Sequence, residues 1–265
     1  MKRLLMCPPI HFNVDYDINP WMSEQIGKVD NHKALVQWQT LFNALKKVAQ
    51  VIILPAELHM PDLVFTANAG TIVGNSAILS RFRHPERRPE EAVFRRWFED
   101  RGYTVEQPKH DYEGEGDHLV DSEGRHWVGW GWRTGYLAPA EVSAMIEQDV
   151  NVLWLSDERW YHLDTCFCPL GPGEILWYPK AFLPKSQELI RNSFQVSVEV
   201  SEEEALDFCC NAVVIDKDVF MPKSPLTAHA LLHLGYKVHE FDLSEFIKSG
   251  GAAKCLVLKC GETTT

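Results

Sequence analysis

Short apolar runs typical of β-strands recur from one end of the chain to the other, and helical patterns alternate with them. The runs are VIIL at 51–54, SAILS at 76–80, HWVGW at 126–130, VLWL at 152–155, EILWY at 174–178, QVSVEV at 195–200, AVVI at 212–215 and KCLVLK at 254–259. Strands that alternate with helices predict an α/β or α+β fold.

Two of the helical segments carry start signals. The first follows Asp30 and Asn31, either of which could cap its N-terminus. The second begins at Ser201 and Glu204, which have the spacing of a capping box. The apolar stripe of the first segment consists of Leu35, Trp38, Phe42, Leu45 and Ala49. The sequence therefore predicts a helix that buries this stripe and another that starts after Ser201.

We expect one domain over residues 1–265, because no linker or change in composition divides the 265 residues. The chain holds 37 acidic and 26 basic residues, a formal net charge of −11. This sign argues against nucleic acid as a partner and is compatible with a cationic small-molecule substrate, although solubility alone would explain it. The residues leave open whether the chain forms a homo-oligomer.

The N-terminal segment lacks the apolar stretch of a secretion signal, and no apolar run approaches the roughly 20 residues that span a bilayer. Seven cysteines, an odd number without regular spacing, suit reduced thiols better than a disulfide framework. These features predict a cytoplasmic protein that does not contact membranes.

Two segments could carry nucleophilic chemistry. In RWYHLDT, His162 and Asp164 share one face if the segment is extended. In SGGAAKCLVLK, Gly250 and Gly251 permit the close approach of a ligand, and Cys255 opens an apolar run that predicts a strand. Each residue alone has an ordinary structural explanation. Together, a thiol and a histidine make a nucleophile with a base, and a bound cation would favour the thiolate.

Two further segments offer polar groups. In YEGEGDHLV, glycines separate Glu113, Glu115 and Asp117, so that a tight turn could bring carboxylates together around a planar cation. An exposed acidic turn is the alternative. In PDLVFTANAG, Asp62 and Asn68 flank a mixed apolar and polar run, which an ordinary strand and turn would also explain.

Several other classes of site have no support. The cysteine pairs Cys166–Cys168 and Cys209–Cys210 lack zinc-ribbon spacing, and no HExxH occurs. The chain also contains no GxGxxG, no phosphate-loop pattern and no GxSxG elbow. The sequence therefore predicts a site without a metal or another cofactor.

The order of PDLVFTAN, YEGEGD, YHLDT and SGGAAKC resembles that of the guanidine-modifying (pentein) superfamily. This superfamily includes arginine deiminase, dimethylarginine dimethylaminohydrolase, glycine amidinotransferase and arginine dihydrolase. With FNVDYDINPWM at the front, the resemblance runs from Cys7 to Cys255. It implies a five-bladed α/β propeller with an active site at its centre, although no repeat is visible in the residues.

The resemblance also implies roles for individual residues. It places the nucleophile at Cys255 and the general acid and base at His162. Glu113 resembles the carboxylate partner of His162, but the extra residue of EGEGD, compared with the EGGD of deiminases, leaves Glu115 as an alternative. Asp164 resembles the aspartate that holds the guanidinium.

For the rest of the substrate, Arg87 in HPERRPEE and Arg133 in GWGWRTG fall where the superfamily grips the α-carboxylate. Asn19 resembles a substrate-contacting position of arginine dihydrolases. Asn68 stands where deiminases and dimethylargininases carry aspartate and where dihydrolases have asparagine.

The activity implied by this pattern is hydrolysis of the guanidinium of free arginine to ornithine, ammonia and carbon dioxide, through a covalent amidino-cysteine. Two enzymatic alternatives stay open: hydrolysis of dimethylarginine, and deimination that stops at citrulline. A non-catalytic arginine-binding protein is the alternative of another class.

Overall fold

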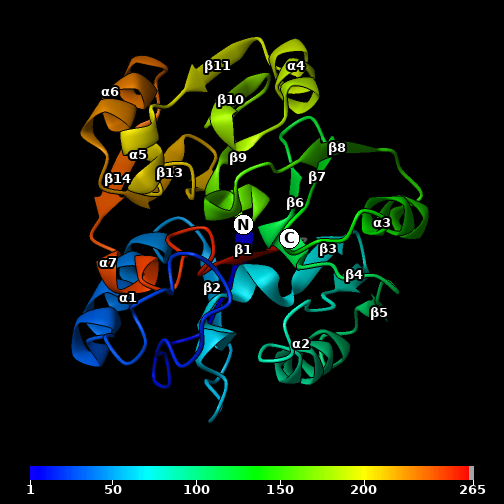
Figure 1. The fold of residues 1–265 in the computed structure, drawn as a ribbon, viewed down its shortest axis with the longest axis vertical. Helices are drawn as coiled ribbons and strands as arrows, with labels where there is room; N and C mark the ends of the chain where they lie inside the picture. Colours follow the sequence, from blue (N-terminus) through cyan, green and yellow to red (C-terminus); the bar gives the residue numbers. More distant parts are fainter. Residues whose placement is uncertain (263–265) are drawn as a thin grey trace.

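The computed structural model describes residues 1–262 and contains five three-stranded sheets, which stand around a common centre like the blades of a propeller (Figure 1). Every blade has the same plan. Its middle strand runs antiparallel to one neighbour and parallel to the other. The α/β propeller with five blades that the resemblance implies is confirmed.

Four blades are continuous in sequence. Their strands are β3 (Gly70–Val73), β4 (Ser76–Leu79) and β5 (Thr104–Glu106); β6 (His118–Val120), β7 (His126–Trp130) and β8 (Val150–Trp154); β9 (Phe167–Pro169), β10 (Glu174–Trp177) and β11 (Val196–Glu199); and β12 (Val213–Ile215), β13 (Asp218–Pro222) and β14 (Lys237–Phe241). The fifth blade combines both ends of the chain, as β15 (Leu258–Glu262), β1 (Lys2–Met6) and β2 (Gln50–Ile53).

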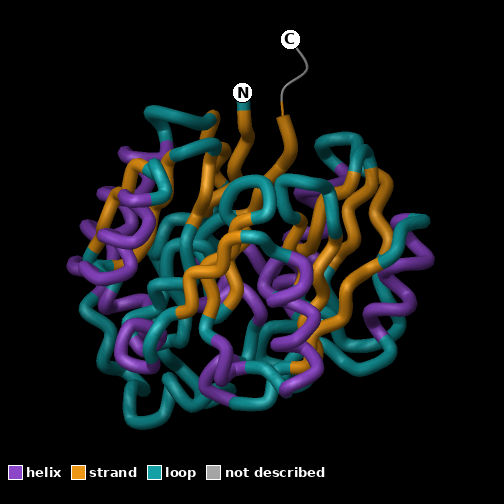
Figure 2. The backbone as a smooth tube through the Cα atoms, turned by 90° about the horizontal axis from the view of Figure 1, so that it is seen from above, coloured by secondary structure: helices purple, strands orange, loops and turns teal. Residues whose placement is uncertain are grey.

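One helix connects the two parallel strands of each blade, because parallel neighbours need a crossover connection. These helices are α1 (Asn31–Leu45), α2 (Pro89–Glu99), α3 (Ala138–Ile146), α4 (Pro184–Ser193) and α6 (Pro225–His233). They lie on the outside of the ring, and the strands lie between them and the centre (Figures 1 and 2). The shorter α5 (Glu202–Leu206) and α7 (Ser244–Ile247) follow β11 and β14.

The predicted helix starts are confirmed in part. Asp30 caps α1 by accepting a hydrogen bond from the backbone N–H of Lys33, and Ser201 and Glu204 form the capping box of α5. The stripe proposed for the first helix was partly wrong, since Leu35 is 42 % exposed. The buried face of α1 is turned by about one residue and consists of Ala34, Gln37, Trp38, Leu41 and Leu45.

The predicted strand at 254–259 is wrong over its first half. Residues 253–256 form turns, and β15 starts only at Leu258. Cys255 therefore lies in a turn before the strand. The segment around His162 is not extended either, because Leu163–Thr165 forms the 3-10 turn η5.

The centre of the ring is built from the turns that precede the first strand of each blade. Three of them are the 3-10 turns η2 (Thr66–Ala69), η3 (Gly114–Gly116) and η5, and irregular turns at 208–211 and 253–256 take the same place in the other two blades. A polar or thiol side chain stands within three residues of each of these first strands. The five are Asn68, Asp117, Asp164, Asn211 and Cys255.

These five residues are separated by 49, 47, 47 and 44 positions. The five-fold repeat is therefore visible in their spacing, although the sequences of the blades are not similar. Within residues 1–262, no helix is long and apolar enough to cross a membrane.

Candidate active site

A small, partly enclosed cavity lies beside the central turns. Of the residues predicted for the site, Asn19, Asn68, Arg87, Arg133 and Cys255 line it. Its volume is about 10 Å³, which is room for about one water molecule. The other lining residues are Ile18, Met22, Asp62, Phe65, Tyr161, Ser249 and Gly251. Five positions that are far apart in sequence thus converge on one cavity.

Cys255 presents its thiol to this cavity and is 2 % exposed. Its Sγ lies 3.3 Å from Asp164 Oδ2, which accepts from the thiol, and 3.1 Å from Asn211 Nδ2, which donates to it. Burial, and then the neighbouring carboxylate of Asp164, raise the pKa of the Cys255 thiol well above its ordinary value. The free protein therefore holds this group as a thiol.

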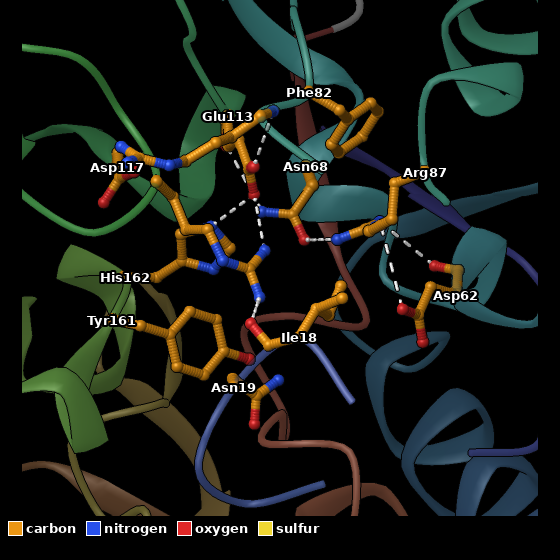
Figure 3. Close-up of polar contacts among 12 residues, drawn as sticks. Ile18, Asn19, Asp62, Asn68, Phe82, Arg87, Glu113, Asp117, Tyr161 and His162 are labelled. Atoms are coloured by element: carbon orange, nitrogen blue, oxygen red, sulfur yellow. Dashed lines mark hydrogen bonds and ion pairs between the residues drawn. The ribbon is translucent and has the colours of Figure 1, made fainter. Parts of the chain in front are cut away.

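His162 and Glu113 form a buried pair. The imidazole Nε2 lies 2.7 Å from Glu113 Oε2, and Arg133 Nη1 donates to the same oxygen at 3.0 Å (Figure 3). Burial lowers the pKa of His162 to about 4 despite the carboxylate. Burial alone would raise the pKa of Glu113, but the charge of Arg133 and the hydrogen bond from His162 outweigh it and hold that pKa below its ordinary value. At neutral pH a neutral imidazole thus faces an ionised carboxylate.

The two glutamates of EGEGD point to different partners. Glu113 contacts His162, whereas Glu115 forms an ion pair with Lys254, with 2.9 Å between Oε2 and Nζ. The contact partner of the imidazole is therefore Glu113. Lys254 directly precedes Cys255 in the chain.

The histidine and the thiol are linked through one turn. Within residues 1–262 no hydrogen bond joins His162 directly to Cys255. Asp164 is the bridge, since it lies two residues after His162 and its Oδ2 contacts the sulfur. The imidazole of His162 thus contacts the carboxylate of Glu113, and the thiol of Cys255 contacts that of Asp164.

Asp164 also carries an unused acceptor. Its Oδ1 is buried and has no hydrogen-bond partner among the described residues. Burial raises the pKa of this carboxyl to about 7, while Lys254, the thiol and Asn211 act in the opposite direction. An unsatisfied buried carboxylate oxygen is costly, so a ligand with N–H donors would be favoured here.

Arg87 and Asn68, which both line the cavity, are joined by a hydrogen bond. Arg87 Nη1 donates to Asn68 Oδ1 at 2.9 Å, and another nitrogen of the guanidinium donates to the backbone carbonyl of Asp62 (Figure 3). Its remaining hydrogen bonds go to the carboxylate of Glu90. Because the arginine fixes Oδ1 as the acceptor, Asn68 Nδ2 donates in turn to the backbone carbonyl of Glu113, at 3.2 Å.

Arg133 stands between the cavity and an outer groove. Its Nη2 donates to the backbone carbonyl of Ile18 at 3.0 Å, and its guanidinium lies over the Tyr161 ring at 4.5 Å. The groove, about 530 Å³ in volume, shares Ile18, Asn19, Arg133 and Tyr161 with the cavity. A ligand that enters from the groove must displace these contacts. The Asn19 side chain donates to the backbone carbonyl of Ser249 at 3.1 Å.

Two residues near the chemistry were missed by the sequence analysis, since Tyr161 lines the cavity and Asn211 contacts the thiol. Asp62, noted in the sequence only as a polar group flanking its segment, is buried and accepts from the Tyr16 hydroxyl at 2.9 Å. Of the two missed residues, only Asn211 had a usable signal, since it follows Asp164 by the same 47 residues that separate Asp164 from Asp117. Among the described residues, no group of three or more histidine, cysteine, aspartate or glutamate side chains is placed to hold a metal ion.

Comparison with known proteins identifies relatives along almost the whole chain. Residues 12–260 match the family described as N,N dimethylarginine dimethylhydrolase, eukaryotic. The bifunctional arginine dihydrolase/ornithine cyclodeaminase AgrE of a Nostoc species is 46 % identical over 98 % of the chain, but the chain spans only 38 % of its length. The N(G),N(G)-dimethylarginine dimethylaminohydrolase of Mycobacterium tuberculosis is 36 % identical, with 97 % of this chain and 85 % of the relative covered.

Solved structures agree with these matches. One is the N-terminal domain of ArgZ, an arginine dihydrolase from cyanobacteria, solved as a cysteine-to-serine variant bound to substrate. It superposes on this chain with a TM-score of 0.97 at 42 % sequence identity, and the superposition covers 99 % of each chain. A dimethylarginine dimethylaminohydrolase adduct gives a TM-score of 0.84 at 25 % identity, with 97 % of this chain and 99 % of that chain covered. The chain therefore belongs to the dimethylarginine dimethylhydrolase family, within the guanidine-modifying (pentein) superfamily.

Proposed function

We propose that this chain is an arginine dihydrolase, which hydrolyses free L-arginine to ornithine, two molecules of ammonia and carbon dioxide. The observation that carries the proposal is that a buried thiol and an asparagine at position 68 line one small cavity, while a histidine–carboxylate pair contacts its wall, since Glu113 accepts hydrogen bonds from Arg133 and Asn68. The substrate-bound ArgZ domain, which matches the chain over its full length, supports the same assignment. Residues 1–265 would then form one catalytic domain that uses no cofactor.

Binding would place the guanidinium against Asp164. The unsatisfied Oδ1 would accept an N–H of the substrate, and a cation next to Cys255 would offset the burial that now keeps the thiol protonated. Arg87 and Arg133 would hold the substrate's α-carboxylate, and Asn19 would contact the substrate from the groove side. Arg133 has to exchange its bond to Ile18 for this role.

The first half-reaction would form a C–S bond. The thiol proton passes to neutral His162, and the Cys255 sulfur attacks the guanidinium carbon. The resulting imidazolium is stabilised by the ionised Glu113 at 2.7 Å and gives its proton to the departing ammonia. A cationic amidino group remains bonded to the sulfur. A histidine with its pKa lowered to about 4 is a weak base in the free protein, so the proton transfer from the thiol requires the bound guanidinium, whose positive charge favours the thiolate.

Water completes the cycle. His162 takes a proton from a water molecule, whose oxygen attacks the amidino carbon, and the C–S bond breaks to release the ureido compound and restore the thiol. A second hydrolysis of the ureido group yields ornithine, carbon dioxide and the second ammonia. In total, one arginine consumes two water molecules.

Asn68 would determine whether the second hydrolysis occurs. A neutral amide keeps an acceptor and adds N–H donors, which suit a neutral ureido oxygen better than an aspartate would. An asparagine-to-serine variant of the ArgZ N-terminal domain was solved covalently bound to a reaction intermediate.

The test is turnover of isotopically labelled arginine followed by mass spectrometry. We expect ornithine as the product, no turnover by the Cys255→Ser variant, and a shift toward citrulline in Asn68→Asp. Citrulline as the sole product of the unmodified chain would disprove the dihydrolase assignment. Undiminished turnover by Cys255→Ser would disprove the nucleophile.

Hydrolysis of dimethylarginine is the second candidate, because the matching family and the mycobacterial relative carry that name. N-methyl groups would reduce the N–H donors available to Asp164 Oδ1, which favours unsubstituted arginine. Release of dimethylamine from asymmetric dimethylarginine, at a kcat/KM above that for arginine, would decide for this alternative. Calorimetric binding of arginine without any ammonia release would instead indicate a non-catalytic binding protein.

A further inference from the structure

Asn211 is fully buried and makes five hydrogen bonds with its side chain alone. It lies in the turn that precedes β12, next to the turn that carries the thiol. Its Oδ1 accepts from the backbone N–H groups of Ala252, Lys254 and Cys255, at 3.1, 3.0 and 3.2 Å. Its Nδ2 donates to the backbone carbonyl of Asp164 at 3.0 Å and to the sulfur at 3.1 Å.

These contacts leave the amide only one orientation. Three backbone N–H groups can bond to an oxygen but not to an NH₂ group, so the oxygen must face the 252–255 turn and the NH₂ group must face the sulfur. An N–H donor that faces sulfur favours the thiolate over the thiol, because hydrogen bonds to a charged acceptor are the stronger ones.

Apart from Asn211, the backbone of Ala252 also lowers the pKa of the Cys255 thiol through a hydrogen bond, and the surroundings of the thiol contain few other stabilising groups. The titratable and charged groups that face it are Asp164 and Lys254, which flank it, and Asp62, Arg87, Arg133 and Tyr161 across the cavity. Asp164 is an acceptor that favours the protonated thiol, and Lys254 is engaged with Glu115. Within residues 1–262, the amide of Asn211 is the one side chain that donates a hydrogen bond to Cys255 Sγ.

We propose that Asn211 is a thiolate-stabilising residue, which donates a hydrogen bond to the Cys255 sulfur while that sulfur carries its negative charge. The proposal rests on the proposed function only in taking Cys255 as the nucleophile. The donor is in place before the proton leaves and is fixed by four other hydrogen bonds, so the charge develops without rearrangement of the turn.

Asn211→Asp tests this directly. The variant keeps an oxygen for the three backbone N–H groups but replaces the NH₂ group at the sulfur with a second acceptor. The measurement is the rate of Cys255 alkylation by iodoacetamide from pH 6 upward until the rate levels off, with the modified peptide quantified by mass spectrometry. We expect the midpoint to rise by at least about one pH unit, and alkylation at pH 7.5 to be at least about tenfold slower, since each pKa unit is a factor of ten in thiolate.

Two further variants complete the experiment. Asn75→Asp makes the same chemical change on an exposed turn and should leave the profile unchanged. Asn211→Ser removes the donor without adding a charge, so it should also raise the midpoint, by less. It decides the question if circular dichroism shows that Asn211→Asp does not fold.

The direction of the change separates the proposal from a structural role. If Asn211 only packed the turn, its loss would open the site to water and bring the thiol pKa down toward its ordinary value, so alkylation would become faster. A lower or unchanged midpoint in both Asn211 variants would therefore overturn the proposal. Because alkylation needs no turnover, a raised midpoint in a chain that releases no ammonia from arginine would refute the proposed function and leave this role standing.

Discussion

The buried ion pair between Glu115 and Lys254 gives the sharpest stability prediction. The two side chains are only 7 % and 4 % exposed, and their charged atoms are 2.9 Å apart. Glu115→Gln conserves the shape of the side chain and removes its charge. The ammonium of Lys254 would then keep the carbonyl of Val257, at 3.2 Å, as its remaining hydrogen-bond partner.

The magnitude follows from the geometry. Two unit charges at this separation attract by about 6 kcal/mol in a medium of effective dielectric constant about 20. Removal of one partner of a buried pair costs about 3–5 kcal/mol in measured cases, because the other charge stays buried and uncompensated. We therefore expect Glu115→Gln to lower the free energy of unfolding by about 3–5 kcal/mol.

The assay is urea unfolding at pH 7.5, followed by tryptophan fluorescence. Glu123→Gln is the matched control, because Glu123 pairs with Arg125 at 2.6 Å but is 47 % exposed, and such a pair contributes less than about 1 kcal/mol. The double variant Glu115→Gln with Lys254→Met should recover part of the loss, since no buried ammonium is then left without its partner and the carboxyl of Asp164, which loses the nearby Lys254, can take up a proton. Equal small losses in Glu115→Gln and Glu123→Gln, or a double variant as unstable as the sum of its parts, would refute the reasoning.

Two other changes test the site and the core. In Gly116→Ala the new β-carbon would clash with Asn68 Nδ2 and lie 3.2 Å from His162 Nδ1, so kcat for ammonia release should fall by about tenfold or more. Gly135→Ala is the control, because the nearest atom to its new β-carbon would be 3.7 Å away, and it should keep its kcat in the same assay. Burial, and then a neighbouring histidine, lower the pKa of His118 to about 3. The unfolded chain binds a proton there below about pH 6.5 while the folded chain does not, so stability should fall as the pH drops from about 6.5 toward 3. His118→Gln should flatten that part of the profile in urea unfolding, and an unchanged slope would contradict the assignment.

Local patterns predicted those elements whose signal lies in adjacent residues. HWVGW is β7 over its full predicted length, and the capping box at Ser201 starts α5, because strand propensity and capping depend on near neighbours. The turns at the centre were harder to predict. Cys255 precedes residues that are apolar enough for a strand, yet Asn211 accepts the N–H groups of the 252–255 turn and holds it out of the sheet.

For the candidate site, too, the sequence predicted the residues that lie in recognisable motifs and missed those that depend on distant contacts. Cys255, His162, Glu113 and Asn68 were predicted because ordered motifs carry them, and the structure brings them to one centre. The choice between Glu113 and Glu115 depended on Lys254, whose side chain reaches Glu115 across 139 residues of sequence, a contact that spacing cannot reveal. Asn211 was hidden inside CCNAVV, where neighbouring apolar residues give a strand signal, and only the interval between blades marks it.

The fifth blade has a consequence for the order of folding. Strand β1 must wait for β15, since Leu4 pairs with Lys259 and Leu5 with Leu258 at the other end of the chain (Figure 2). Cys255 lies three residues ahead of that last strand. A growing chain could therefore complete four blades before β15 and Cys255 are synthesised, and the central site is complete only once the fifth blade has closed.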